Sequence, residues 1–286
     1  MDYCWYDVVD HVRRAARTRR VGHTGTLDPG ATGLLILCVG TATRLSEHLT
    51  GLDKTYEGTM RLGVTTDSFD MDGKVLEERP VPELALRDIQ EKCDAFVGDI
   101  LQIPPMISAV KVGGERLYKM ARKGEVVERE PRPVTVYEFS VQSVTLPDVE
   151  VRVRCSRGTY VRSLCHDVGQ ALGCGAILAS LRRTEVGRFQ VKDAAPLTAL
   201  SDVASVEERL LSMDEALDLP QVIVNRLGRD AVRSGGKLTV AELRGQCPVR
   251  EGWVQVKSEQ GELLALATVE RSALGVLVQP RRVFTQ

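Results

Sequence analysis

Residues 149–173 read VEVRVRCSRGTYVRSLCHDVGQALG, and this stretch predicts a β-strand that turns directly into a helix. From 149 to 156 valine alternates with charged residues, which is the pattern of a half-buried strand. After Gly158 apolar residues recur at three- and four-residue spacings, as they do along one side of a helix. These residues are Val161, Leu164, Val168 and Leu172. Arg162 lies off that apolar side, so its role needs a separate explanation.

Strand patterns recur on both sides of this stretch. Residues 54–63, 108–114 and 132–144 alternate or carry β-branched runs, and the continuous apolar run 34–40 predicts a buried central strand. Many of these strands follow one another without a helix between them. The sequence therefore predicts an α+β fold with a large mixed, mostly antiparallel sheet flanked by helices.

Helical patterns fill the intervals. A helix is expected from Asp7, as its N-cap, to about Arg17, and a short one over 41–51 that ends at Gly51. Residues 83–97 form an amphipathic pattern, and a further helix is expected near 115–124. The inner face of the 83–97 helix is predicted to consist of Leu86, Ile89, Cys93 and Phe96.

Length and composition describe an ordinary globular protein. The chain has 286 residues, of which 43% are apolar and 27% charged, and this excludes a disordered or collagen-like chain. No apolar run approaches the roughly 18 residues of a membrane span and no secretory signal is recognisable, so the cytoplasm is expected. Short β-like segments dominate from about Leu219. We therefore expect a catalytic domain over residues 1–218 and a small β domain over 219–286.

The net charge of −1 conceals a basic segment. Residues 13–20, RRAARTRR, contain five arginines, and Arg152, Arg154, Arg157 and Arg162 follow later. A basic face on a neutral protein is typical of a polyanion partner such as nucleic acid. The alternative is that these arginines are solvated helix faces, and charge alone separates the two only modestly.

Metal binding receives little support. The seven cysteines never form C-x-x-C, so they resemble reduced core thiols, and Cys165-His166 is an unconvincing ligand pair. Residues 68–79 approach calcium-loop spacing, but position one is Ser68 and position twelve is Arg79. A solvated turn whose carboxylates orient a nearby basic side chain is the better interpretation.

Residues 21–35, VGHTGTLDPGATGLL, surround a single carboxylate with glycines and threonines. The segment is no P-loop, because no lysine occurs before residue 54. A G-x-x-G at 22–25 that clamps RNA backbone is a weak alternative. Pro29 biases Asp28 toward extended geometry, which suits a carboxylate nucleophile held out on a loop, although Asp-Pro-Gly is also a common surface turn.

Several blocks in the same order resemble the TruB family of pseudouridine synthases. They are GHTGTLDPGATGLL (22–35), DKTYEGTMRLGVTTDSFDMDG (53–73), QIPPMISAVKVGGERLYKMARKG (102–124), RPVTVYEF (132–139), CSRGTYVRSLCHDVG (155–169) and LRRTEVGRF (181–189). The resemblance implies a pseudouridine synthase catalytic domain and a C-terminal PUA-like RNA-binding domain. It also implies conversion of uridine 55 to pseudouridine in the TΨC loop of tRNA, without cofactor or metal.

The resemblance also implies residue roles. Asp28 matches the catalytic aspartate, Arg162 its arginine partner and Tyr56 the tyrosine that stacks on the target base. His23 matches a histidine that enters the opened RNA loop, and Tyr160 a pocket aromatic. The other residues expected to contact RNA are Gly22, Thr24, Gly25, Thr26, Arg19, Arg20 and Arg182.

The chemistry explains these residue types. Cleavage of the C1′–N1 bond needs an ionised carboxylate beside the ribose, and an arginine within a few ångström favours the charged form. Arginine is preferred to lysine because its planar fork forms two parallel bonds. A stacked uracil must be flipped out of the loop, and an aromatic ring such as Tyr56 offsets part of that cost.

One departure and two alternatives accompany the resemblance. Family members usually begin with a strand and loop of the type LDKPxGxTS, and here only MDYCWY precedes Asp7, so we expect a native strand to be missing. A non-catalytic RNA-binding or RNA-folding module would need no Asp28–Arg162 pair. A small-molecule enzyme would need no basic segment. A monomer is expected, because RNA would cover the basic face.

Overall fold

The computed structural model describes residues 4–108, 110–124, 127–245, 247, 251–272 and 275–284. Contacts divide the chain into two compact units. The larger unit comprises Met1–His11, His23–Leu37 and Glu47–Leu197, and the smaller comprises Val12–Gly22, Cys38–Ser46 and Thr198–Gln286. The sheet of the smaller unit lies wholly within residues 219–286, and the domain boundary after residue 218 stays a prediction.

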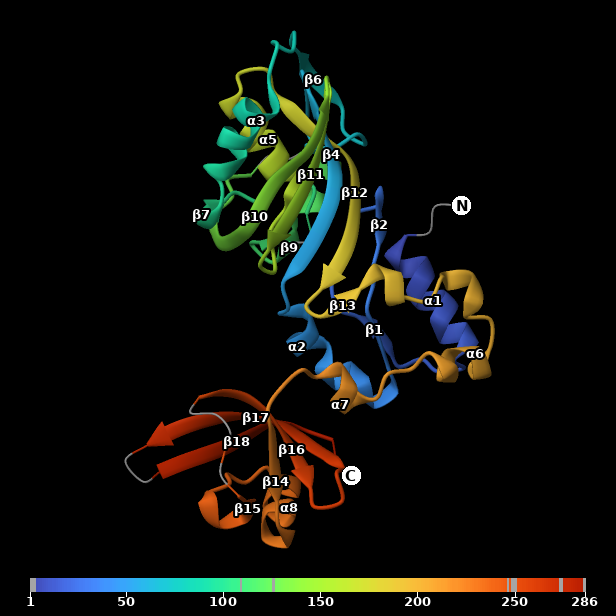
Figure 1. Cartoon of the computed structure of the whole chain (residues 1–286). Helices are drawn as coiled ribbons and strands as arrows, with labels where there is room; N and C mark the ends of the chain where they lie inside the picture. The colour runs from blue at the N-terminus through green and yellow to red at the C-terminus, as the bar shows by residue number, and fades with distance from the viewer. Residues whose placement is uncertain are drawn as a thin grey trace. The chain divides into compact units, whose positions relative to one another are not determined.

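The larger unit is built on one sheet of mostly antiparallel strands (Figure 1). Neighbour by neighbour the strands are β13 (Phe189–Gln190), β12 (Ala176–Val186), β4 (Lys54–Leu62), β11 (Asp148–Cys155), β10 (Arg132–Thr145) and β7 (Gly98–Gln102). A seventh strand, β2 (Ala31–Gly33), runs parallel to β12. The predicted α+β class with a mixed, mostly antiparallel sheet is confirmed.

The alternation in β11 separates a core face from a solvent face. Val149, Val151 and Val153 are buried, while Arg152 points to the opposite side. The buried face packs against α3 (Leu86–Asp94) and α5 (Val161–Ala171), which cover the same side of the sheet (Figure 1). The largest fully buried side chains of this core include Met60, Ile89, Phe139 and Leu164. Leu86 is 44% exposed, so it does not belong to the inner face of α3 as predicted.

The apolar run 34–40 is not a central strand, and this prediction was wrong. It forms the short β3 (Leu37–Val39), which pairs with β1 (Val21–His23) in a separate two-stranded sheet. The central position is taken by β4, where Gly58 allows close approach of β12: a Cβ there would lie 2.5 Å from the carbonyl oxygen of Ser180. Apolar composition alone therefore did not identify the central strand.

The helix near the N-terminus, α1 (Trp5–Ala15), begins three residues earlier than a helix capped by Asp7 would. Asp7 lies in its first turn, and its carboxylate accepts a hydrogen bond from the N–H of Cys4 at 3.0 Å. Asp7 is therefore not the N-cap, but it still satisfies an N–H at the helix start. The short helix predicted over 41–51 is found as η1 (Gly40–Leu45) and α2 (Ser46–Thr50), and it ends at Gly51.

Smaller elements complete the larger unit. Polar residues that follow β4 form the hairpin of β5 (Val64–Thr66) with β6 (Val75–Glu78). The remaining elements are β8 (Lys111–Val112), β9 (Glu115–Arg116), α4 (Leu117–Arg122) and η2 (Val191–Asp193).

The smaller unit holds a separate five-stranded sheet. Its strands, neighbour by neighbour, are β15 (Leu243–Arg244), β14 (Gln221–Val224), β16 (Gly252–Ser258), β17 (Leu263–Ser272) and β18 (Gly275–Val283). Besides η1, helices of this unit include α6 (Val203–Glu208), α7 (Met213–Ala216), α8 (Arg226–Arg233) and η4 (Val240–Glu242), and η3 (Leu197–Ala199) lies at the boundary between the two units. The sheet has its own core, which includes Val254, Val256 and Leu264. Over the described residues, no helix combines the length and the apolar character that crossing a bilayer requires.

Candidate active site

Asp28 sits in a tight turn beside the edge of the main sheet. The carbonyl of Asp28 accepts a hydrogen bond from the N–H of Ala31 at 2.9 Å, which closes the predicted Asp-Pro-Gly turn. Three residues later, β2 joins β12 with Gly33 opposite Arg183. A Cβ at Gly33 would lie 2.3 Å from the carbonyl oxygen of Arg183, so only glycine allows this approach. The turn is thus fixed to the sheet immediately after Asp28.

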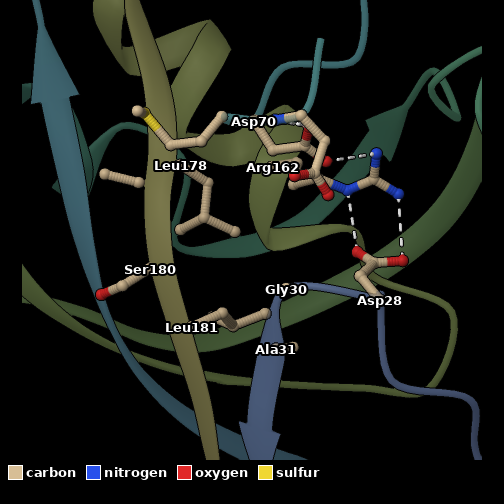
Figure 2. A pocket seen from close by; sticks show the side chains of 11 residues that line it. Asp28, Gly30, Ala31, Asp70, Arg162, Leu178, Ser180 and Leu181 are labelled. Carbon is tan, nitrogen blue, oxygen red and sulfur yellow. Dashed lines mark hydrogen bonds and ion pairs between the residues drawn. The ribbon is translucent and has the colours of Figure 1, made fainter. Parts of the chain in front are cut away.

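Arg162 provides the charge partner that the carboxylate requires. It lies in the first turn of α5, and its side chain is only 3% exposed. Its Nη2 donates to Oδ1 of Asp28 at 3.2 Å, and its Nε lies 2.8 Å from Oδ2 (Figure 2). The guanidinium therefore meets both carboxylate oxygens, although 134 positions separate the two residues.

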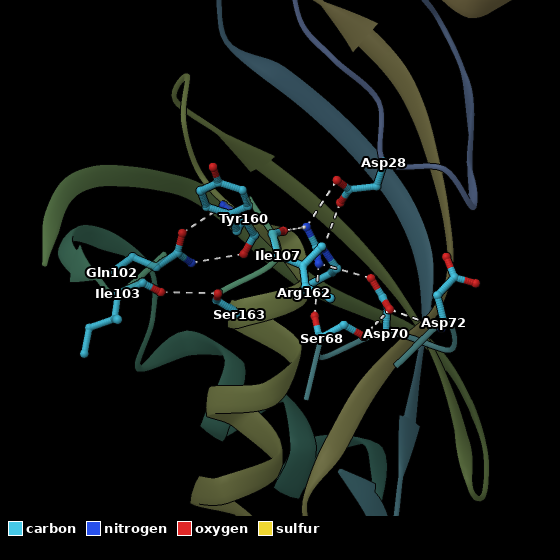
Figure 3. A network of polar contacts seen from close by, with 10 residues as sticks. All are labelled: Asp28, Ser68, Asp70, Asp72, Gln102, Ile103, Ile107, Tyr160, Arg162 and Ser163. Carbon is cyan, nitrogen blue, oxygen red and sulfur yellow. Dashed lines mark hydrogen bonds and ion pairs between the residues drawn. The ribbon is translucent and has the colours of Figure 1, made fainter. Parts of the chain in front are cut away.

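The other contacts of Arg162 fix its direction (Figure 3). Nη1 donates to the carbonyl of Ser68 at 3.0 Å and to Oδ2 of Asp70 at 3.1 Å, and Nη2 donates to the carbonyl of Ile107 at 3.1 Å. The loop 67–73 therefore orients a basic side chain, as predicted. The loop is only partly a solvated turn, because Asp67, Met71 and Asp72 are exposed whereas Ser68 is 1% exposed.

The pKa of Asp28 is raised above its ordinary value, contrary to the expectation that arginine would dominate. Burial is the largest cause; Arg162 lowers the pKa by its charge and hydrogen bond, and the charges of Asp70 and Asp72 raise it. The Asp28 side chain nevertheless keeps 39% of its surface exposed, so a substrate can reach the carboxylate.

A pocket opens beside this ion pair (Figure 2). Asp28, Asp70, Asp72 and Arg162 provide its charged wall, and residues of β12 provide the opposite wall. The remaining lining residues are Gly30, Ala31, Met71, Leu178, Ala179, Ser180 and Leu181. A flat, partly apolar group such as a nucleobase matches a site with apolar and charged walls.

Both predicted tyrosines lie near the carboxylate. Burial raises the pKa of Tyr56 to about 12, and the charge of Asp28 adds to this rise. Burial likewise raises the pKa of Tyr160, with a further contribution from Asp28. Gln102 pairs with the main chain of Tyr160: it donates to the carbonyl at 3.0 Å and accepts from the N–H at 2.8 Å. Because both pKa values are raised, the hydroxyls of Tyr56 and Tyr160 stay protonated at neutral pH.

The segment before Asp28 only partly matches its predicted role. His23 is half-buried against Trp5, with ring centroids 4.7 Å apart, and its Nδ1 accepts the N–H of Gly25 at 3.3 Å. Burial lowers the pKa of His23. Thr26 is exposed, but Thr24 is buried, so the expected contact between the Thr24 side chain and RNA does not fit the structure.

The predicted basic residues differ in their burial and in the unit to which they belong. Arg19, Arg20 and Gly22 belong to the smaller unit, where both arginines are exposed. Arg182 is exposed on β12. Of the later arginines, Arg162 is buried in the site, whereas Arg154 and Arg157 are exposed. Arg152 lies between the carboxylates of Glu57, Glu138 and Glu185, at 3.6 to 3.9 Å.

Four functional candidates escaped sequence reasoning. Asp70 accepts a hydrogen bond from Arg162, and Gln102 accepts one from the N–H of Tyr160. Arg183 is 2% exposed beneath the Asp28 turn. Lys54 is buried, donates to the carbonyls of Thr50 and Leu52, and burial lowers its pKa to about 8. A single sequence does not show which charged residues become buried. The feature that could have identified these four residues is that Arg183, Lys54, Asp70 and Gln102 all lie in the motif blocks that resemble the family.

The cysteine thiols and the Cys165-His166 pair behave as structural groups. All seven cysteines are free, and five of them are buried: Cys38, Cys93, Cys155, Cys165 and Cys174. His166 stacks on Phe69 with ring centroids 4.0 Å apart. Within the described ranges, no cluster of His, Cys, Asp and Glu has the arrangement of a metal site.

Sequence comparisons agree with this geometry. The family model "TruB family pseudouridylate synthase (N terminal domain)" matches residues 13–161, and "tRNA pseudouridylate synthase B C-terminal domain" matches residues 162–218. The tRNA pseudouridine synthase B of Opitutus terrae is 50% identical over 213 residues, covering 74% of this chain and 88% of the relative. The proteins of that name from Heliobacterium modesticaldum and Burkholderia mallei are 39% and 44% identical; each match covers 98% of this chain and 92% of the relative.

Solved structures give the same result. The chain in "Crystal Structure of a Cbf5-Nop10-Gar1 Complex" matches with a TM-score of 0.76 at 26% identity, covering 99% of this chain and 82% of that one. The chain in "Structure of H/ACA RNP bound to a substrate RNA containing 2'-deoxyuridine" matches with a TM-score of 0.71 at 25% identity, and the match covers 99% of this chain and 82% of that one. With its family-model matches and its forked aspartate–arginine pair beside a pocket, this chain belongs to the TruB family of tRNA pseudouridine synthases.

Proposed function

We propose that this tRNA pseudouridine synthase acts, as a monomer in the cytoplasm, on uridine 55 in the TΨC loop, and that Asp28 is its catalytic carboxylate. The observation that carries the proposal is the forked contact of buried Arg162 with a carboxylate that solvent still reaches. Arg162 has further partners in Ser68, Asp70 and Ile107, so its direction toward Asp28 is fixed before any substrate binds.

The reaction is an isomerisation in which no atom is gained or lost. The C1′–N1 bond breaks, the uracil turns, and a C1′–C5 bond forms while the proton on C5 is lost and N1 gains one. The carboxylate of Asp28 can add to C6, add to C1′ or remove a ribose proton, and each route requires it to be ionised. Arg162 then stabilises the charged form, and its hydrogen bond to Oδ1 and its ion-pair contact with Oδ2 hold the carboxylate in place.

The tyrosines fit the handling of a flipped base. Because the Tyr56 hydroxyl stays protonated, the ring presents a neutral face to uracil, and stacking contributes about 1–3 kcal/mol. Tyr160 stands at the N-cap of α5, two residues before Arg162. His23 is the candidate to occupy the vacated place in the RNA loop, and the exposed Thr26, Arg19, Arg20 and Arg182 are candidates to contact phosphates.

The experiment compares wild type with Asp28→Asn on an unmodified tRNA transcript and maps pseudouridine after carbodiimide modification. We expect product at uridine 55 with wild type and a loss of at least about 1,000-fold with Asp28→Asn. Asp94→Asn, which changes an exposed carboxylate on α3, serves as the matched control and should keep wild-type activity.

Three outcomes separate the alternatives. Equal product from wild type and Asp28→Asn would refute the catalytic role of Asp28. Product at another uridine would refute the choice of the TΨC loop. Tight tRNA binding by wild type without any product would favour an RNA-binding or RNA-folding module instead.

A further inference from the structure

Arg183 lies directly beneath the loop that carries Asp28. It belongs to β12, where it is paired with Tyr56 of β4 on one side and with Gly33 of β2 on the other. Its side chain is 2% exposed, and burial of a guanidinium is costly unless its N–H groups are bonded. An arginine retained at this depth therefore needs a reason beyond packing.

The hydrogen bonds of Arg183 reach both ends of the Asp28 loop. Nε donates to the carbonyl of Leu34 at 2.8 Å, and Nη2 donates to the carbonyl of Gly25 at 3.1 Å. The main-chain carbonyl of Arg183 accepts the N–H of Leu34 at 2.8 Å. One side chain thus bridges residues 25 and 34, and the eight residues between them include Asp28.

The same guanidinium reaches the aromatic side of the site. Besides the dominant effect of burial, the charge of Arg183 lowers the pKa of His23, and its charge and side-chain hydrogen bond lower that of Tyr56. Nη1 lies 3.4 Å from the place a Cβ would take on Gly25. The loop, the histidine and the tyrosine therefore surround one fixed cation.

We propose that Arg183 is a positioning residue for pseudouridine formation, which clamps the Asp28 loop at both ends and sets it in register with Tyr56. The inference rests on the proposed function of Asp28 and goes beyond the Asp28–Arg162 pair. Arg183 acts through the main chain of the loop, whereas Arg162 bonds the carboxylate itself.

The clamp requires the geometry of arginine. The Nε–H and Nη2–H bonds diverge from one rigid plane toward two carbonyls that are nine positions apart in the chain. A lysine keeps the charge but replaces the plane with a single ammonium on a flexible stem. We therefore expect Arg183→Lys to fold and bind tRNA while Asp28 is misplaced.

The test measures single-turnover pseudouridine formation and the Kd for tRNA separately. For Arg183→Lys we expect the rate to fall about 100-fold, the effect of a misplacement of about 1 Å, with Kd changed by less than about threefold. Arg61→Lys is the matched control: Arg61 also makes a forked contact, with Asp148 at 2.7 and 2.8 Å, but it is outside the pocket. Its rate should equal that of wild type.

Two results would overturn the proposal. The first is a rate for Arg183→Lys within about threefold of wild type, and the second is a loss explained entirely by a weaker Kd. If Arg183→Lys fails to fold by circular dichroism, Arg183→Gln, which keeps an N–H donor without the charge, is judged by the same two criteria.

Hydrogen exchange separates this proposal from the proposed function. The amide of Ala31 closes the Asp28 turn, so Arg183→Lys should speed its exchange while amides of β16 and β17 stay unchanged. This readout holds even if the wild-type protein forms no pseudouridine. If Ala31 exchanges at the same rate in Arg183→Lys as in wild type, the clamp is rejected. If Ala31 exchanges faster in Arg183→Lys but the wild-type protein forms no pseudouridine, only the catalytic assignment is rejected.

Discussion

Asp28 shows how a single carboxylate is prepared by its neighbours. Arg162 opposes the effect of burial, yet burial and the charges of Asp70 and Asp72 leave the pKa of Asp28 above its ordinary value. Arg162 is shared between Asp28 and Asp70, so part of its charge is directed at a second carboxylate. If Asp28 has the proposed catalytic role, the balance between these two contacts should set the pH at which the site becomes active.

This balance leads to a prediction on pH. Because the ionised form of Asp28 is required, the rate should rise as pH increases through its raised pKa, so the acid limb lies above the pH expected for an ordinary aspartate. Asp70→Asn removes a negative charge that raises the pKa of Asp28. It also removes the second carboxylate with which Arg162 forms an ion pair. The acid limb should then move to lower pH, by about 1 unit.

Single-turnover rates of wild type and Asp70→Asn between acidic and neutral pH provide the measurement. Asp72→Asn is the comparison, since Asp72 is the smallest of the stated causes and should shift the limb less. An acid limb that stays in place or moves to higher pH in Asp70→Asn would show that Asp70 does not control the ionisation of Asp28.

At the scale of elements, the site depends on a short parallel strand added to the edge of an antiparallel sheet. β2 contains only three residues, and its register on β12 is Ala31 opposite Leu181 and Gly33 opposite Arg183. The sequence predicted β4, β10 and β11 from their alternation, because a half-buried surface imposes a period of two, but it did not predict the 11-residue β12. It could not predict β2, since three residues show no period.

Gly33 gives a prediction at this scale. In Gly33→Ala the new Cβ would lie 2.3 Å from the carbonyl oxygen of Arg183, and the φ of +99° disfavours any side chain. The backbone conformation alone costs about 1–3 kcal/mol, and the clash should separate β2 from β12. We expect a lower free energy of unfolding and a rate at least about 100-fold lower, because the anchor of the Asp28 turn is lost.

Gly173→Ala provides the matched control, measured by urea unfolding and by the same rate assay. Gly173 has a φ of +81° but no heavy atom within 4 Å of the new Cβ, so it carries the conformational cost without the clash. If Gly33→Ala and Gly173→Ala lose equal stability and both stay active, the close approach of β2 to β12 is not needed for catalysis.

At the scale of the whole molecule, a chain of net charge −1 has to bind a polyanion. Its charge is distributed unevenly: Arg19 and Arg20 are exposed, whereas Arg162 and Arg183 are buried and Arg152 is surrounded by glutamates. Only the exposed arginines are free to contact phosphate. Counting arginines therefore overstates the RNA-binding surface, because burial and pairing remove some of them.

The salt dependence of tRNA binding tests this view. If Arg19 and Arg20 each contact a phosphate, the double variant Arg19→Gln/Arg20→Gln should flatten the slope of log K against log salt by about 1 per arginine. Arg87→Gln is the control, since Arg87 is exposed on α3 and is not among the residues expected to contact RNA. A slope in the double variant equal to that of wild type would remove both arginines from the interface.

The sequence by itself determined the α+β class, the strands β4, β10 and β11, the helices α1 to α5 and, through the motif blocks, the two residues of the ion pair. Period and motif are local properties that survive without coordinates. Only the tertiary structure decided that Asp70 shares Arg162, that Arg183 clamps the Asp28 loop, and that Thr24 is buried. It also decided that the run 34–40 is not the central strand. These facts depend on distances between segments far apart in the chain, and on burial, which a residue acquires only from what folds around it.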